Sequence, residues 1–163
     1  MAGPNLFEPE FDGGSERPGF ASRRARLGRQ AGAERLGASL YELPPGQAAW
    51  PYHVHLANEE LLIVVRGRPH LRGPDGWRQL AEGELVSFPV GERGAHQIVN
   101  RTDEPVRVLL VSEMNAPDIA LYPDSGKVGA FGRAPGSRAD GLKLYLPRSA
   151  AIDYWEDEEP PGP

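Results

Sequence analysis

Short apolar runs separated by turn residues fill the middle of the chain. From Leu36 to about Met114 they recur every 8 to 12 residues or so, roughly the spacing typical of an all-β sandwich or barrel. The Gly73-Pro74-Asp75-Gly76 segment suits a tight turn and predicts a hairpin. We therefore expect a small closed or rolled architecture with strands at 36–43, 48–55, 61–66, 69–72, 77–80, 84–88, 95–100 and 106–112.

The expected strand at 61–66 begins with Leu-Leu-Ile-Val-Val, which is apolar on both faces. One face of such a strand lines a barrel, and the other must meet a second layer. Two sources of that layer are open. The chain's own flanking arms can cover the face, or a second copy can do so in a homodimer, because closed symmetric dimers are the commonest oligomers.

The segments on either side of this region differ in composition. Residues 1–34 mix proline, glycine and charge and predict an N-terminal arm, solvated or strapped on, in which 22–35 is arginine-rich and forms a short helix or an ordered stretch. Residues 35–115 predict the barrel core, and 116–155 an extension that packs on it. Residues 156–163 form an acidic, proline-rich tail that we expect to be mobile, because its charges repel and its prolines lack amide donors.

Composition and charge narrow the classes of molecule that the protein could bind. A chain of 163 residues suits one domain. The formal charge of -5 disfavours a nucleic-acid partner. No apolar run reaches the roughly 20 residues that span a membrane, and the N-terminus has no secretory signal pattern, so we expect a cytoplasmic protein that binds a small molecule. The absence of cysteine leaves His, Asp and Glu as metal ligands.

Four residues stand at spacings that suit one metal ion. His53 and His55 are two apart, so on a strand both imidazoles project from the same face. Glu60 opens the next strand and can return a carboxylate to the same interior, and His96 completes the set from a distant strand. Three nitrogens and a carboxylate suit one divalent transition metal such as Zn, Mn, Fe, Ni or Co. His70 is expected at the surface and is not a predicted ligand.

These residues resemble the two motifs of the cupin superfamily. The first motif is matched by Gly46, His53, His55, Glu60 and Gly67, with one extra residue after Gly46. The second is matched by Gly83, Pro89, Gly91, His96 and Asn100, with two extra residues before His96. The resemblance implies an all-β, double-stranded β-helix, which is the conical jelly-roll barrel of cupins.

The segments 117–127 and 153–155 are similar to small cupins labelled as sugar-phosphate isomerases. That similarity implies a cupin metalloprotein acting on a small polar metabolite as an isomerase or lyase, with the ion as Lewis acid. Two alternatives are open. An Fe-dependent dioxygenase would bind oxygen at open coordination positions, and a noncatalytic module would bind a metal or metabolite without turnover.

Proton transfer in such a site needs a further group, for which Glu59 and Tyr52 are the candidates. Strand alternation sends Glu59 and Glu60 to opposite faces, and the spacing to Gly67 favours Glu60 as the ligand.

Three further residues are candidates for the pocket lining: Tyr41, Gln97 and Arg66. By the two-residue period, Arg66 shares the face of Glu60 and would attract an anionic substrate. Alternatively, its guanidinium reaches solvent from the end of the strand.

Overall fold

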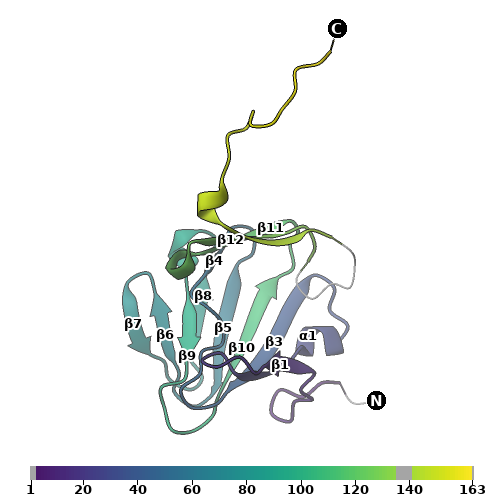
Figure 1. The fold of residues 1–163 in the computed structure, drawn as a ribbon. Helices are drawn as coiled ribbons and strands as arrows, with labels where there is room; N and C mark the ends of the chain where they lie inside the picture. The colour runs from purple at the N-terminus through teal and green to yellow at the C-terminus, as the bar shows by residue number, and fades with distance from the viewer. Residues whose placement is uncertain (1–2, 135–140, 163) are drawn as a thin grey trace.

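The computed structural model describes residues 3–134 and 141–162 (Figure 1). The described chain is mostly antiparallel strand, which confirms the predicted all-β class. Its helices are short: α1 (Leu27–Gln30), η1 (Glu92–Gly94), η2 (Pro123–Ser125) and η3 (Arg148–Ala150). Its strands are β1 (Gly13–Ser15), β2 (Ser22–Ala25), β3 (Leu36–Leu43), β4 (Val54–His55), β5 (Glu60–Arg66), β6 (His70–Gly73), β7 (Gly76–Gln79), β8 (Leu85–Phe88), β9 (Gln97–Val99), β10 (Val106–Glu113), β11 (Asp118–Tyr122), β12 (Lys127–Phe131) and β13 (Lys143–Pro147).

Most of the predicted strands are found, but the one expected at 48–55 is wrong in extent. Only Val54–His55 is a strand, and the rest contributes two isolated bridges, Ala48 to Val99 and His53 to His96. Pro51 lies in the middle of the predicted strand and has no N–H for a ladder, so regular pairing is interrupted there. The predicted hairpin is confirmed, since Gly73 pairs with Gly76.

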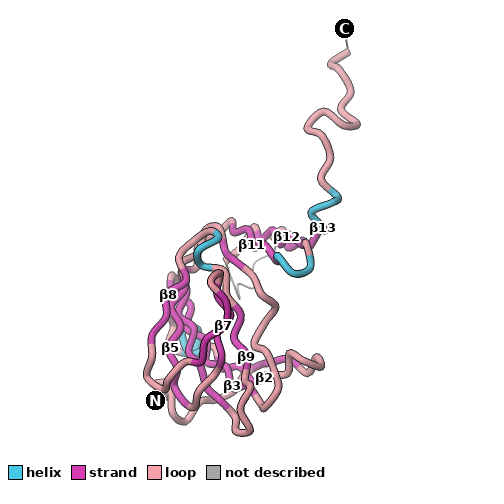
Figure 2. The backbone as a smooth tube through the Cα atoms, turned by 90° about the vertical axis from the view of Figure 1, so that its left-hand side faces the viewer, coloured by secondary structure: helices cyan, strands magenta, loops and turns pink. Residues whose placement is uncertain are grey.

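Two sheets enclose the main core. One has the order β1-β2-β3-β10-β5-β8 and the other the order β7-β6-β9. Alternate residues of each strand point between the sheets, and this packing buries Leu43, Leu62, Val64, Leu71, Leu80, Phe88, Ile98, Val106 and Val108. Figure 2 shows the two layers from the side.

The N-terminal arm adds to the six-stranded sheet. β2 pairs with β3, and α1 follows β2 against the outer face of that sheet. Ala25, Leu27 and Leu40 form a second buried cluster, against which Phe11 and Val65 also pack. The chain's own N-terminal arm therefore covers part of the outer apolar face of β5, the strand predicted to be apolar on both faces. The homodimer stays a prediction.

The C-terminal extension forms a sheet of its own with one barrel strand. The order is β13-β12-β11-β4, and β11 pairs with β4 through Ala120 with His55 and Leu121 with Val54. β11 and β12 run across one end of the barrel (Figure 1). The extension is thus joined by backbone hydrogen bonds to the short strand that carries His55.

The chain beyond β12 is exposed. Every residue of β13 is exposed, and the segment after η3 projects away from the sheets (Figures 1 and 2). Ile152, Tyr154 and Trp155 are 68%, 81% and 72% exposed. The predicted acidic tail lies at the end of this segment, and its last residue falls outside the described ranges. Within those ranges, no helix is both long and apolar enough to cross a membrane.

Candidate metal centre

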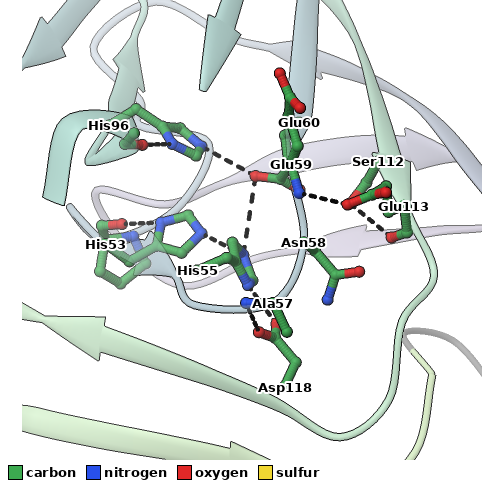
Figure 3. Close-up of polar contacts among 12 residues, drawn as sticks. His53, His55, Ala57, Asn58, Glu59, Glu60, His96, Ser112, Glu113 and Asp118 are labelled. Carbon is green, nitrogen blue, oxygen red and sulfur yellow. Dashed lines mark hydrogen bonds and ion pairs between the residues drawn. The ribbon is translucent and has the colours of Figure 1, made fainter. Parts of the chain in front are cut away.

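The four predicted ligands come together near the paired strands β4 and β11 (Figure 3). His53 and His96 face each other across an antiparallel bridge, with amide-to-carbonyl distances of 3.2 Å and 2.9 Å. His55 follows two residues later in β4, and Glu60 opens β5. Residues 53–60 and the sequence-distant His96 therefore present their side chains to one space.

The ligand atoms of these residues lie close together. His53 Nε2 is 3.1 Å from His55 Nε2, and Glu60 Oε2 is 3.8 Å from His55 Nε2 and 3.4 Å from His96 Nε2. Ligand atoms of His53, Glu60 and His96 all lie within 4.8 Å of one another, and these three residues are buried. Such separations match donor atoms arranged around a single ion.

The other ring nitrogen of each histidine has an acceptor. Nδ1 donates to the Pro51 carbonyl at 3.0 Å in His53 and to the Gly94 carbonyl at 2.9 Å in His96. In His55 it donates to Asp118 Oδ2 at 2.6 Å. An acceptor at Nδ1 assigns the proton to that nitrogen and leaves the Nε2 lone pair directed at the shared space. All three imidazoles are thus oriented as metal ligands.

A tight loop places His96. Gly91 has φ of 81°, and the backbone then turns through η1 back towards Pro89. A Cβ on Gly94 would lie 1.8 Å from the Pro89 carbonyl oxygen, so only glycine fits there. The Phe88 ring stacks on the His96 imidazole with centroids 3.8 Å apart. Loop and ring together fix the imidazole that closes the ligand set.

The electrostatics keep two histidines neutral. Burial lowers the pKa of His53 to about 4 and holds the pKa of His96 well below its usual value. Burial also raises the pKa of Glu60. For His55 burial acts to lower the pKa, but the hydrogen bond to Asp118 and the charges of Glu60 and Asp118 outweigh it, so its pKa is raised. Neutral imidazoles are the form that binds metal.

Two buried atoms of the cluster lack a hydrogen-bond partner, and they show whether the site fits an ion. Within the described ranges, neither Glu60 Oε2 nor His96 Nε2 has a hydrogen-bond partner. Both atoms are acceptors in the assigned tautomer, and they face each other at 3.4 Å. Buried acceptors without a donor are costly, and a cation between them would satisfy both. The nitrogen and carboxylate donor set fits a divalent transition metal.

The cluster lies in a cavity of about 710 Å³. His53, His55 and Glu60 line it, together with residues of the N-terminal arm, β3 and β10. Of the predicted pocket residues, Tyr41 lines this cavity. Gln97 instead donates a hydrogen bond to the Trp50 carbonyl at 3.1 Å, and Arg66 is exposed at the end of β5.

The two residues predicted to transfer protons lie elsewhere. Glu59 is exposed on the opposite face from Glu60, and its amide donates to Glu113 Oε2 at 3.0 Å. The guanidinium of Arg72 lies over the Tyr52 ring, with Arg72 Cζ 4.1 Å from the centroid of that ring. The structure therefore brings neither side chain to the cluster. His70 lies in β6, away from the cluster.

Asp118 was missed by sequence reasoning. It is 2% exposed, holds His55 Nδ1 and accepts a hydrogen bond from the Ala57 amide at 3.1 Å. Burial acts to raise the pKa of Asp118, but its hydrogen bonds and above all its interaction with His55 outweigh burial, so the pKa is lowered. It is 63 residues from His55 in sequence, and an aspartate at the start of a strand carries no local signal of such a partner.

Comparisons with known proteins agree with this fold. Residues 39–112 match the Cupin domain family model. A sugar phosphate isomerase of the cupin superfamily from Silicibacter pomeroyi is 25% identical, with a TM-score of 0.76 over 92% of this chain and 95% of its own.

A provisionally named sugar phosphate isomerase from Acidithiobacillus ferrooxidans is also 25% identical, with a TM-score of 0.72 over 83% of this chain and 82% of its own. The polyketide cyclase RemF from Streptomyces resistomycificus is 26% identical, with a TM-score of 0.52 over 60% of this chain and 68% of its own. No curated protein sequence matches the chain.

Proposed function

We propose that the chain is a cupin, as the match of residues 39–112 to the Cupin domain model supports, and that it binds one divalent transition metal and acts on a small polar metabolite as an isomerase or lyase. One observation carries the proposal. Three imidazole nitrogens and the Glu60 carboxylate converge in a single cavity, where Glu60 Oε2 and His96 Nε2 are buried without a partner. That arrangement is costly for the protein alone and is explained by a bound ion.

The residues that would hold the ion are His53, His55, Glu60 and His96. A divalent ion bound there would supply Lewis acidity to a carbonyl or hydroxyl oxygen of the substrate. The chain's own contribution is to fix the ligands before the ion arrives. The carbonyls of Pro51 and Gly94 and the carboxylate of Asp118 set the three rings through their Nδ1 atoms.

Tyr41 is the proton donor that the cavity offers. It lines the same cavity as the ligands, and its ring packs edge-on against Trp50 with centroids 5.1 Å apart. Burial raises the pKa of Tyr41, against the opposing effect of Arg24, so its Oη stays protonated near neutral pH. A protonated hydroxyl in this place can donate a hydrogen bond to a substrate oxygen that gains charge.

The names of two structural matches that cover more than four fifths of this chain favour isomerisation of a sugar phosphate. Fold alone does not assign chemistry, because cupins and other barrels host many reactions. The cavity agrees with a polar substrate, since Asn58, Ser112 and three arginines are among the residues that line it.

The proposed function can be tested on protein reconstituted separately with Mn, Fe, Ni, Zn or Co. Each form is incubated in D₂O with aldose and ketose phosphates. Proton NMR then follows loss of the signal from the hydrogen on the carbon next to the carbonyl, which exchanges for deuterium. We expect exchange or product with at least one metal and none with the His96→Ala variant. Metal uptake without exchange across the panel would instead favour a binding module, and oxygen consumption by the iron form would favour a dioxygenase.

Replacing Asp118 by asparagine is expected to weaken metal binding by about 10- to 100-fold, as is typical when the partner of a ligating histidine is lost. The amide removes the negative charge that raises the basicity of His55 and no longer fixes its Nδ1 proton. Competition with a metal-sensitive dye measures the affinity. Asp124→Asn is the matched control, because Asp124 lies in the same extension but pairs with Arg72 at the surface. Equal affinities in both variants would contradict the role of Asp118.

A further inference from the structure

The cavity of the metal cluster extends to the N-terminal arm. β2 pairs with β3 so that Arg24 lies opposite Tyr41, and both line the cavity. The arm therefore contributes a guanidinium to the space that holds His53, His55 and Glu60. The arginine nitrogens lie over β1, where a Cβ on Gly13 would be 3.2 Å from Arg24 Nη2.

Arg24 differs from its neighbours in how its charge is balanced. Arg23, on the opposite face of β2, pairs with Glu42 at 3.1 Å, and Arg26 pairs with Asp12 at 3.1 Å. In the part of the chain that the structure describes, Arg24 makes no ion pair. Its Nε is buried and has no hydrogen-bond partner. Arg24 is half-buried, and a guanidinium with a buried, unpaired nitrogen and no carboxylate nearby is costly unless a ligand supplies the negative charge.

A second donor in the same cavity is also without an acceptor. The indole Nε1 of Trp50 is buried and has no hydrogen-bond partner within the described ranges. Trp50 lines the cavity between the two sets of groups, with its ring 5.1 Å from Tyr41 and 5.7 Å from His96. Indole and guanidinium nitrogens can only donate, so Trp50 Nε1 and Arg24 Nε each lack an oxygen acceptor that a ligand in the cavity can supply.

The sheet register fixes how far these groups are apart. Tyr41 pairs with Val108 and Val108 with Val64, so Arg24 lies in the row of Val64. Glu60 is four residues away on β5, about 13 Å along the strand direction, and β5 is three strands from β2, about 14 Å across the sheet. Arg24 and Glu60 therefore lie towards opposite ends of the cavity that both of them line. A ligand there would have an anionic group at the Arg24 end and a metal-facing oxygen at the other.

We propose that Arg24 binds the phosphate or carboxylate group of an oxygen-rich anionic ligand in this cavity, and that the Trp50 indole donates to an oxygen of the same ligand. This inference rests on the proposed function for the position of the ligand's other end. It makes Arg24, which lies outside the cupin domain, the residue that selects anionic substrates.

The test uses the indole N–H resonance of Trp50, assigned with Trp77→Phe and Trp155→Phe variants. Metal-free and metal-loaded full-length proteins are titrated with sodium phosphate and with sodium acetate, with sodium chloride balanced throughout. We expect a saturable shift with at least one anion, and the anion that gives it identifies the group. Arg24→Met should weaken that binding by about tenfold or more, since charge-assisted hydrogen bonds are lost.

Arg23→Met is the matched control, because it removes the same charge from the same strand but on the opposite face. Unchanged affinity in this variant, with partial recovery in Arg24→Lys, supports the proposal. Equal affinity in Arg24→Met and wild type, or equal weakening in the Arg23 variant, overturns it. So does the absence of a shift with both anions in the metal-loaded wild type.

Elemental analysis of the same samples separates the two claims. Arg24→Met should retain the wild-type metal content, because Arg24 contacts none of the ligand atoms. Arg24-dependent anion binding by a wild type that takes up no metal would sink the proposed function and leave the role of Arg24 standing. Metal uptake with no Arg24-dependent binding would overturn only the inference about Arg24.

Discussion

Replacing Glu60 by glutamine is expected to abolish stoichiometric metal binding and, at the same time, to raise the melting temperature of the metal-free protein. Burial raises the pKa of Glu60, so keeping its carboxylate ionised at pH 7 to 8 costs folding free energy. Glutamine has nearly the same shape and carries no charge. Exchanging buried charge for a neutral group is often stabilising by roughly 1 kcal/mol or more, which for a chain of this size is about 2–4 °C.

Metal content and calorimetry of chelator-treated protein measure the two effects of Glu60→Gln. The metal affinity should fall by more than the roughly 100-fold expected for loss of a residue that only supports a ligand. Glu59→Gln is the matched control, since Glu59 is the exposed neighbour on the other face, and it should change neither quantity. A Glu60→Gln protein that keeps its metal, or whose metal-free form melts lower, would show that this carboxylate is structural.

Gly94→Ala is expected to lower the free energy of unfolding by about 3 kcal/mol, at the upper end for an overpacked site, and to weaken metal binding as well. The new methyl group would lie 1.8 Å from the Pro89 carbonyl oxygen and 3.0 Å from the Phe88 carbonyl carbon. Both are backbone atoms, so the loop itself must move. His96 moves with it, because its Nδ1 donates to the carbonyl of Gly94.

Urea unfolding of the metal-free protein and dye competition measure the two effects of Gly94→Ala. Gly73→Ala is the control, because a Cβ at Gly73 meets nothing within 4 Å. It should leave stability within about 0.5 kcal/mol of wild type, as surface substitutions usually do. Wild-type metal affinity in Gly94→Ala would show that the loop does not position His96.

Local patterns sufficed for most of the barrel and for the four candidate ligands. The apolar runs of β3, β5 and β10 predict the strands, and the fixed side-chain period of a strand predicts which of their residues share a face. The same rule separates Glu60, which lines the cavity, from exposed Glu59. The spacing of His53 and His55 likewise predicts two rings on one side.

Features that depend on pairing between distant segments were not predictable in this way. The His53 region forms a single bridge with His96 instead of a long strand, because Pro51 interrupts the ladder. Asp118 reaches His55 only because β11 pairs with β4. Arg24 is one of several arginines in an arm expected to be solvated or strapped on, and it enters the cavity because β2 adds to the edge of β3.

The four candidate ligands all lie within residues 39–112, whereas Asp118 and Arg24 lie beyond that range on opposite sides. Substitutions in the two flanking segments can therefore alter the affinity for the ion and the choice of anion while every ligand stays the same. Proteins that share this barrel and this histidine pattern can diverge in chemistry through the segments that add strands on either side of the barrel core, which are about the first 30 and the last 50 residues here. Sorting relatives by the identity of the residues aligned with Arg24 and Asp118 would group them by substrate more closely than the ligand motif does.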